Sequence, residues 1–299
     1  MSRDDYLSAD QLTDDANLDL SLRPRSFGEF VGREQTVENL QTWINGARHR
    51  GEPLDHVLFS GPPGLGKTTL AFIIANELGV DIHSTTGPAL DRPRDLAGLL
   101  TTLQRGDILF IDEIHRMNIA VEEYLYTAME DFYIDVIIDQ GPNARSLRLN
   151  LPKFTLIGST TREGLLTPPL RGRFQILERL DYYKPDELKQ IIKNSARLLD
   201  VNIDENAAEL MAERARGTPR IANRFLRRIR DEAHGLGTDR ITIDVARSGL
   251  RRLSVDENGL SEMDRRILQA IAQGSKPVGL KTIGVMVGDL ATTRDGERL

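Results

Sequence analysis

Residues 61–69 form a candidate phosphate-binding loop, and no other feature restricts the possible folds of this chain as strongly. They read Gly-Pro-Pro-Gly-Leu-Gly-Lys-Thr-Thr and match the pattern G-x-x-x-x-G-K-[ST]. The apolar run 57–59 before the loop predicts a buried strand, and the apolar residues 70–75 after it predict a helix packed on a sheet. A loop between a strand and a helix directs backbone N–H groups and the helix dipole at one point, which favours a phosphate. The chain is therefore predicted to have an α/β fold that binds a nucleotide.

Each residue type in the loop suits one part of a nucleotide. Gly64 and Gly66 let the backbone approach the phosphates. Lys67 is expected to reach the β- and γ-phosphates, and the hydroxyl of Thr68, which Thr69 follows, is expected to ligate magnesium. The alternative is a glycine-rich turn with a surface lysine, which the flanking strand and helix disfavour.

A second apolar run, 108–111, ends in two carboxylates. It predicts a buried parallel strand whose acids emerge at its carboxyl end, at the sheet edge that also holds the phosphate loop. Asp112 is placed to hold magnesium through water, and Glu113 is placed to polarise the attacking water as a general base. A strand that merely ends in acidic loop residues is the alternative.

Residues 154–161 predict a further buried strand that ends in hydroxyl side chains. A polar group between the loop and the acids can align the attacking water. Thr160 and Thr161 both fit this role, and the residues alone do not separate them.

Two arginines, Arg171 and Arg173, precede the strand predicted at 175–177. An arginine offered to the γ-phosphate of a neighbouring subunit would stabilise the transition state by about a thousandfold or more in rate. A pair of surface arginines is the alternative, and spacing alone does not reject it.

Changes in sequence character divide the chain into four segments. Residues 1–20 are acidic and predict a disordered tail. Residues 21–183 alternate strand and helix patterns, including a strand near 80–82 and a helix over 93–103, and predict a large ATPase domain. Residues 184–255 contain helix patterns only, near 186–199, 204–215, 219–234 and 242–250, and residues 256–299 predict a small C-terminal head domain with an incomplete core.

Residues 133–151 alternate apolar and polar side chains on both sides of a Gly-Pro turn, which predicts a β-hairpin inserted in the large domain. Its own core is too small to bury both faces, so the hairpin should protrude. We interpret the hairpin as an element that contacts a partner, and a protruding hairpin without a function is the alternative.

Composition excludes several classes of protein. The chain has no cysteine, which excludes disulfides, iron–sulfur clusters and thiolate zinc sites. It has no long apolar run and no signal-peptide pattern, so we expect a cytoplasmic protein without a membrane partner. A net charge of −6 argues against broad attraction to nucleic acid but leaves open a local basic patch.

The ordered series of motifs resembles the AAA+ ATPases and, within them, the RuvB family of bacterial Holliday-junction branch-migration helicases. The resemblance covers about residues 20 to 290. Its motifs are 22–24 (LRP), 61–69, 111–116 (IDEIHR), 128–131 (AMED), 156–158 (LIG), 217–224 (GTPRIANR) and 277–280 (PVGL).

The resemblance implies a fold, a function and partners. The fold would be an α/β P-loop AAA+ domain with a parallel sheet and helices on both faces, followed by a small all-helical lid and a partial winged-helix-like domain. The function would be that of a homohexameric ring that uses ATP and Mg²⁺ to pump duplex DNA through Holliday junctions in recombination and repair. RuvA would dock on the 133–151 hairpin, and a RuvC-type resolvase would act in the same pathway.

The resemblance also implies further site residues. Arg173 would be the arginine finger, Thr161 the first sensor and Arg220 the second sensor. The other residues near the nucleotide would be Leu22, Arg23, Glu130, Asp131, Phe132 and Tyr183.

The resemblance fades after residues 287–289. In the family, the last domain is a winged helix whose basic wing touches the DNA backbone. Residues 293–299 do not continue that pattern, so we expect either a shortened or altered product or a terminus that differs in this lineage, and no wing residue is assigned.

Three other classes of nucleotide-binding protein fit less well. A protein-remodelling unfoldase needs an aromatic pore loop, and residues 81–106 contain no aromatic residue. Many clamp-loader subunits carry a cysteine zinc module and a Ser-Arg-Cys finger, whereas residues 170–173 read Leu-Arg-Gly-Arg. A GTPase would carry an Asn-Lys-x-Asp motif, which does not occur.

Overall fold

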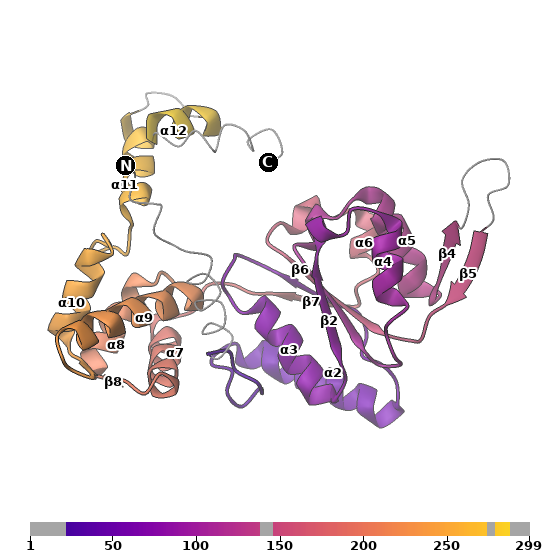
Figure 1. Cartoon of the computed structure of the whole chain (residues 1–299), viewed down its shortest axis with the longest axis horizontal. Helices are drawn as coiled ribbons and strands as arrows, with labels where there is room; N and C mark the ends of the chain where they lie inside the picture. The colour runs from indigo at the N-terminus through magenta and orange to yellow at the C-terminus, as the bar shows by residue number, and fades with distance from the viewer. Residues whose placement is uncertain (1–21, 138–145, 274–278, 288–299) are drawn as a thin grey trace. The chain divides into compact units, whose positions relative to one another are not determined.

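The computed structural model describes residues 22–137, 146–273 and 279–287 (Figure 1). The chain divides into two compact units, with unit 1 ending at Tyr182 and unit 2 beginning at Tyr183. The acidic tail predicted at 1–20, the tip of the predicted hairpin and the residues after 287 lie outside the described residues.

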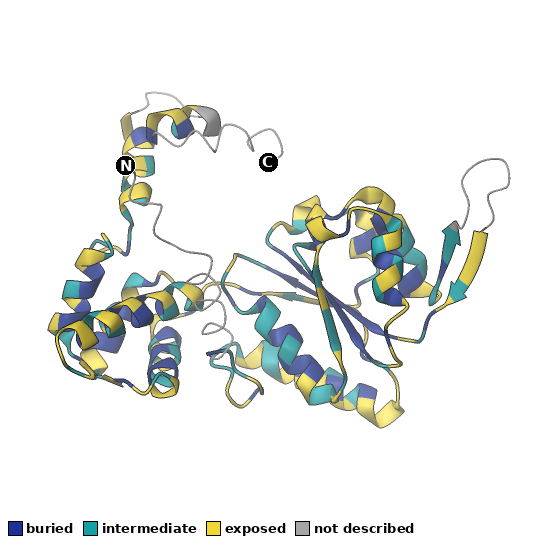
Figure 2. Cartoon of the chain, viewed as in Figure 1, coloured by how far each residue is buried: buried dark blue, intermediate teal, exposed yellow. Residues whose placement is uncertain are grey.

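A five-stranded parallel sheet forms the centre of unit 1, with strand order β2-β3-β6-β1-β7. Three of its strands are buried along almost their whole length, because helices cover both faces of the sheet (Figure 2). The strands are β1 (Val57–Ser60), β2 (Ile82–Thr86), β3 (Ile108–Asp112), β6 (Thr155–Thr160) and β7 (Ile176–Arg179).

Helices lie on both faces of this sheet (Figure 1). One face is covered by α2 (Glu34–Arg50) and α3 (Lys67–Leu78), and the other by α4 (Pro93–Leu100), α5 (Ile119–Glu130) and α6 (Pro168–Arg171). The predicted α/β fold with a parallel sheet is confirmed.

Two elements of unit 1 differ in extent from the prediction. The helix predicted over 93–103 ends at Leu100, because Thr101 and Thr102 turn their hydroxyls back onto carbonyls of the last turn. The strand predicted at 80–82 instead begins at Ile82 and continues through polar residues to Thr86. β2 lies at the edge of the sheet and pairs only with β3, so its side chains stay partly exposed and need no apolar pattern.

The predicted hairpin is present as two antiparallel strands, β4 (Tyr133–Ile137) and β5 (Ser146–Asn150). Across the pair, Arg148 makes a two-point ion pair with Asp135 at 3.0 and 3.1 Å. Its guanidinium also lies 3.9 Å from the centre of the Tyr133 ring. These contacts fix the register of the hairpin where its side chains are largely exposed.

Unit 2 is built mainly from helices. A parallel pair of two-residue strands, which the sequence pattern did not predict, links the loops on either side of α8 and α9. The elements are α7 (Pro185–Leu198), β8 (Asn202–Ile203), α8 (Glu205–Arg214), α9 (Pro219–Gly235), β9 (Arg240–Ile241), α10 (Ile243–Arg252), α11 (Glu262–Gln273) and α12 (Leu280–Val287).

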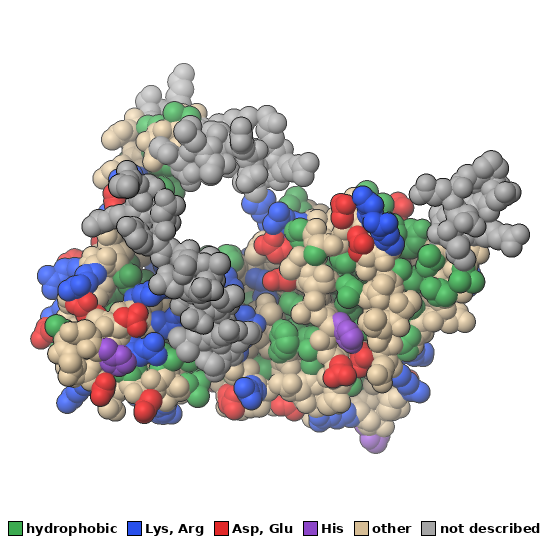
Figure 3. Space-filling view, in the orientation of Figure 1, with side chains coloured by type: hydrophobic (Ala, Val, Ile, Leu, Met, Phe, Trp, Pro, Cys, Tyr) green, Lys and Arg blue, Asp and Glu red, His purple; other side chains and the backbone are tan. Residues whose placement is uncertain are grey.

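Two surface properties bear on function. Figure 3 shows acidic and basic side chains interspersed over the face of each unit that is in view, in keeping with the modest net charge of −6. Within the described residues, no helix is long and apolar enough to cross a membrane.

Candidate nucleotide-binding site

The phosphate loop and the end of β6 meet at the carboxyl edge of the sheet. In the parallel pairing of β1 with β6, Ser60 lies opposite Thr160. The next residue, Gly61, donates its N–H to the carbonyl of Thr160 at 3.1 Å. Ligands of open α/β sheets bind at this edge, outside the carboxyl ends of the strands.

The acidic strand ends at the same place. β3 pairs with β6 so that Ile111 lies opposite Gly158, which brings Asp112 beside Ser159. The Ser159 hydroxyl donates to Oδ1 of Asp112, and the same oxygen accepts the backbone N–H of Glu113 at 3.0 Å. Two donors therefore orient the Asp112 carboxylate.

The loop itself depends on glycine backbone geometry. Gly61, Gly64 and Gly66 have φ values of 132°, 79° and 97°, a region that favours glycine. A Cβ on Gly61 would lie 2.1 Å from the carbonyl oxygen of Leu180, so no other residue fits there. The positive φ values turn the chain sharply into α3, whose first residue is Lys67.

The Lys67 ammonium lies over its own loop. It donates to the carbonyl oxygens of Gly61 and Pro62, both at 2.8 Å. A phosphate is a stronger acceptor than a carbonyl and can replace these bonds. Thr68 and Thr69 follow in the first turn of α3, and both are half-buried.

Glu113 adopts a left-handed backbone conformation, with φ 49°, directly after β3. Its carboxylate pairs with Arg116, with Oε2 2.8 Å from Nη1. Both side chains are partly exposed, so the pair is weak and exchanges readily with water.

The two threonines at the end of β6 have different surroundings. Thr160 is fully buried, and its hydroxyl lies 2.9 Å from Nδ1 of His115 and accepts the N–H of Arg162 at 3.0 Å. Burial lowers the pKa of His115, which favours the neutral ring. Thr161, one residue beyond the strand, is half-buried.

A second group of predicted residues gathers around Arg173. Its Nη2 lies 3.1 Å from Oε2 of Glu130, and its Nη1 donates to the carbonyl of Pro169 at 2.8 Å. The guanidinium lies 4.3 Å from the centre of the Tyr126 ring. Arg173 thus binds the carboxyl end of α5 in its own chain.

This second group lies near the amino ends of the strands, opposite the phosphate loop at their carboxyl ends. His56 comes directly before β1, and its Nε2 lies 3.1 Å from the carbonyl of Met129, the residue before Glu130. The end of α5 is therefore held at the amino edge, whereas the phosphate loop follows the carboxyl end of β1. Four residues of β1 separate the two edges by about 13 Å, at roughly 3.3 Å per residue.

The residues after Glu130 also face the amino edge. The Phe132 ring packs edge-on against Phe154, just before β6, with ring centres 6.0 Å apart. Asp131 is exposed. The stretch 130–132 is therefore not brought to the phosphate loop of its own chain.

The remaining predicted residues fall in both units. In unit 1, Leu22 is buried with 6% exposure, and Arg23 is half-buried. In unit 2, the Tyr183 N–H donates to the carbonyl of Gly217 at 3.0 Å, in the turn that leads into α9. Arg220 lies in the first turn of α9, so Tyr183 and Arg220 belong to one corner of unit 2.

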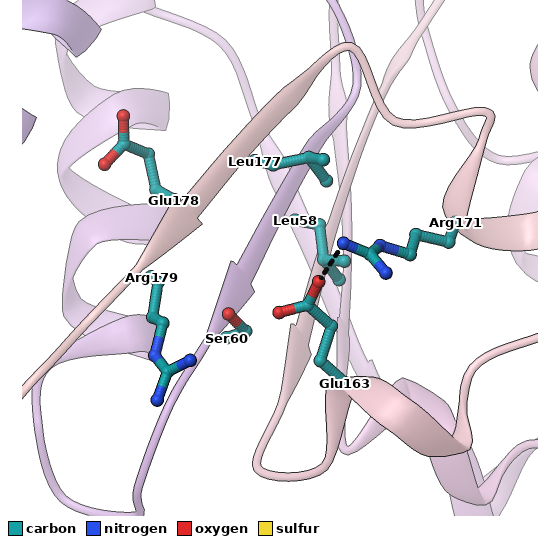
Figure 4. Close-up of a pocket in the computed structure, with 7 residues that line it drawn as sticks. All are labelled: Leu58, Ser60, Glu163, Arg171, Leu177, Glu178 and Arg179. Carbon is teal, nitrogen blue, oxygen red and sulfur yellow. Dashed lines mark ion pairs between the residues drawn. The ribbon is translucent and has the colours of Figure 1, made fainter.

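A small pocket of about 150 Å³ lies beside β1 and β7, and it contains no residue of the phosphate loop (Figure 4). Arg171 and Glu163 form an ion pair across it at 2.8 Å. Arg171, the other arginine of the predicted finger region, is therefore engaged within its own chain. The candidate nucleotide site lies where the strand ends converge, and this pocket contributes no residue of the phosphate loop to it.

The structure adds three residues to the site that the sequence analysis did not assign a role. Ser159 on Asp112, His115 on Thr160 and Arg116 on Glu113 all contact predicted residues. The run of hydroxyl side chains at the end of β6 is recognisable in the sequence. The hydrogen bond between Ser159 and Asp112 is not, because it depends on the pairing of β3 with β6.

Comparison with known proteins identifies close relatives over most of the chain. The P-loop domain of the Holliday junction DNA helicase RuvB matches residues 22–180, and the RuvB AAA lid domain matches residues 183–256. The RuvB subunit of the Holliday junction branch migration complex from Myxococcus xanthus is 59% identical over 97% of this chain and 85% of that protein. The subunit from Salinibacter ruber is 54% identical over 98% of this chain and 86% of that protein. The structure of the Thermotoga maritima RuvB Holliday junction branch migration motor is similar with a TM-score of 0.82 and 49% identity, over 91% of this chain and 87% of that one.

Proposed function

This chain belongs to the RuvB family and is an ATP-hydrolysing motor subunit of Holliday-junction branch migration, and on that basis we propose that it works as a homohexameric ring with ATP sites between subunits. One observation carries the proposal. The phosphate loop lies at the carboxyl edge of the sheet, while Arg173 is bound at the end of α5 near the amino edge. A finger that acts on ATP would therefore come from a neighbouring chain.

The subunit that holds the nucleotide would supply the phosphate grip. The backbone N–H groups of Gly64 and Gly66, with those of Thr68 and Thr69 at the start of α3, would cradle the phosphates. Lys67 would exchange its loop carbonyls for the β- and γ-phosphates.

The residues present fit a magnesium ion. Magnesium takes oxygen ligands, usually one or two from the protein and the rest from phosphates and water. The hydroxyl of Thr68 and the carboxylate of Asp112, which Ser159 orients, are such donors at one sheet edge. They would hold the ion, which when bound neutralises charge on the β- and γ-phosphates.

Glu113 would act as the general base toward the attacking water. Its carboxylate must first leave Arg116, and the exposed ion pair permits that at small cost. Thr161 would align the water or the γ-phosphate as the first sensor. The buried hydrogen bonds of the Thr160 hydroxyl favour this assignment, because they commit that side chain to His115 and Arg162.

The remaining contacts with the nucleotide would come partly from the subunit that holds it and partly from the adjacent subunit. Leu22 and Arg23 would border the adenine, and Tyr183 and Arg220 would approach the nucleotide from the lid. Residues 130–132 would approach it, with Arg173, from the adjacent chain, because they lie at the opposite sheet edge from their own phosphate loop.

We further propose that the β4–β5 hairpin docks RuvA and that the ring drives duplex arms of the junction, with a RuvC-type resolvase acting in the same pathway. The names of the relatives, which refer to a Holliday junction branch migration complex and motor, support action on such junctions within a complex. ATPase and branch-migration assays on a synthetic four-way junction, with and without RuvA and across a salt series, test this directly. A failure to respond to either partner would leave only an ATPase.

Mixing two inactive variants tests the shared site. Lys67→Ala subunits keep the finger but lose the phosphate grip, and Arg173→Ala subunits keep the grip but lose the finger. An equal mixture should recover ATPase to about a quarter of the wild-type rate, because random assembly in a ring pairs an intact site with an intact finger at that frequency. As a control, each variant alone should remain inactive. No recovery at any mixing ratio would contradict a finger acting between subunits.

A further inference from the structure

Three side chains form a hydrogen-bonded cluster that includes Tyr126, the residue whose ring contacts the guanidinium of Arg173. Glu122 and Tyr126 come from successive turns of α5, and Thr167 precedes α6. The Tyr126 hydroxyl donates to Oε1 of Glu122 at 2.5 Å, and the Thr167 hydroxyl donates to the same oxygen. The two hydroxyl oxygens lie 3.0 Å apart. One carboxylate therefore fixes both hydroxyls.

The carboxylate at the centre of the cluster is shielded from water. Glu122 is only 6% exposed, which is rare for a carboxylate unless hydrogen bonds satisfy it. Burial also raises the pKa of Tyr126, so its phenol stays protonated and continues to donate. The ring of Tyr126 is thereby held in one orientation.

This ring supports the arginine. The guanidinium of Arg173 lies 4.3 Å from the ring centre, and its side chain is 20% exposed. The carbonyl of Pro169 binds Nη1 at 2.8 Å. Ring and carbonyl together define the plane and the rotation of the guanidinium, and the exposed carboxylate of Glu130 pairs with Nη2.

The same cluster positions the backbone that carries the finger. Thr167 caps α6 by accepting the N–H of Leu170 at 3.4 Å, and Arg173 lies two residues past the end of that helix. Through Glu122, the cap of α6 is tied to α5. A short helix with one cap has little stability of its own, so α5 sets where the finger stands.

We propose that Tyr126 is a positioning residue for Arg173, holding the guanidinium in the orientation in which it is presented to the nucleotide of the neighbouring subunit, with Glu122 and Thr167 fixing the ring. This inference rests on the proposed role of Arg173 as a finger. A flexible arginine that loses this support reaches the phosphate in fewer of its conformations, so turnover falls while ATP affinity, set by the other subunit, is unchanged.

The mixing assay places the test in one subunit at a time. Tyr126→Leu is introduced either into the Lys67→Ala chain, which donates the finger, or into the Arg173→Ala chain, which holds the ATP. In the finger-donating chain it should lower kcat of the mixture about three- to thirtyfold, the range of a cation–π contact, with KM for ATP unchanged. In the ATP-holding chain it should have no effect.

Tyr126→Phe keeps the ring but removes the hydroxyl through which Glu122 and Thr167 hold it, so it should recover only part of the lost kcat. Tyr124→Phe removes a hydroxyl from the same helix and serves as the matched control. Ring assembly of every variant is measured by sedimentation, so a folding defect is seen separately.

The outcomes separate the two proposals. An equal loss of kcat with Tyr126→Leu in the finger-donating chain and in the ATP-holding chain would mean that Tyr126 supports the fold only. No loss of kcat with the substitution in either chain would mean that Tyr126 does not position the finger. Each result overturns this inference alone. Failure of the parent mixture to recover ATPase would overturn the proposed function and this inference with it.

Discussion

At the scale of single residues, His56 shows how a buried side chain can be committed to one protonation state. Its Nδ1 accepts the backbone N–H of Leu156 at 2.8 Å, so the proton must lie on Nε2, which donates to the carbonyl of Met129. Burial lowers the pKa of the ring. The neutral histidine ties β6 and the end of α5, to which Arg173 is bound, to the start of β1.

This commitment predicts a pH dependence of stability. In the unfolded chain His56 titrates near 6.5, whereas in the folded chain it titrates lower, so the unfolded state binds more protons as pH falls below about 6.5. The free energy of unfolding should fall with decreasing pH in this window, by at most about 1.4 kcal/mol per pH unit from this residue.

Urea unfolding of the wild type and of His56→Gln between pH 7.5 and 5 measures this contribution. The variant should be less stable at pH 7.5, by about 1–3 kcal/mol for the disturbed buried hydrogen bonds, and its stability should depend less on pH. Parallel pH profiles would show that His56 is not the group responsible.

Glu113 provides a second prediction at this scale. Glu113→Gln keeps the size of the side chain but removes the base, so ATP should still bind while kcat falls by about 10²–10⁴. The variant also loses the exposed pair with Arg116, which contributes at most about 1 kcal/mol to folding. Single-turnover hydrolysis and equilibrium ATP binding separate the two effects, with Lys67→Ala as the variant that loses binding. Undiminished turnover would remove Glu113 from the site.

At the scale of secondary structure elements, the hairpin combines a buried base with an exposed apolar side chain. Ile134 and Leu151 are buried and anchor its base in the core, whereas Leu147 on β5 is 47% exposed. Leu147 is the exposed large apolar side chain in the described part of the hairpin, so it is the contact to test for the proposed docking of RuvA.

Leu147→Asp should therefore weaken RuvA binding by about tenfold or more, because docking would then bury a charge, and should leave the basal ATPase unchanged. Binding to RuvA and the RuvA-stimulated branch migration rate are the measurements. Ser146→Asp adds the same charge to the neighbouring exposed position, whose side chain points to the other face of the strand, and should have a smaller effect. Equal effects of the two variants would exclude a specific apolar contact at Leu147.

The elements also show what the sequence can and cannot predict. β1, β3 and β6 are apolar runs because both faces are buried, and such runs are recognisable locally. The polar edge strand β2 and the two-residue strands β8 and β9 depend on neighbours far along the chain, so local patterns indicate them poorly.

The same distinction applies to the candidate site. Lys67 and Asp112 belong to short contiguous motifs, so their roles can be predicted from the residues next to them in the sequence. The contact between Ser159 and Asp112 follows from the pairing of β3 with β6. The separation of Arg173 from its own phosphate loop follows from its ion pair with Glu130 at the end of α5, together with the hydrogen bond between His56 and Met129. Both depend on the strand order and tertiary contacts, which no local pattern contains.

At the scale of the whole molecule, the placement of the phosphate loop and of Arg173, the proposed finger, at opposite ends of the strands has a consequence for activity. If each site needs Arg173 from an adjacent chain, a separated subunit holds ATP without its transition-state partner. The finger of such enzymes contributes about 10³–10⁵ to kcat, so a subunit alone should be nearly inactive.

The specific ATPase activity of the wild type should therefore fall steeply on dilution, in parallel with loss of the ring seen by sedimentation velocity. A site complete within one chain would instead keep a constant activity per subunit at every concentration. Arg173→Ala should stay at the low level throughout and provides the floor of the measurement. Constant activity of the wild type across a range in which the ring dissociates would contradict the shared site, whatever the mixing experiments gave, because dilution removes the neighbour without altering any side chain.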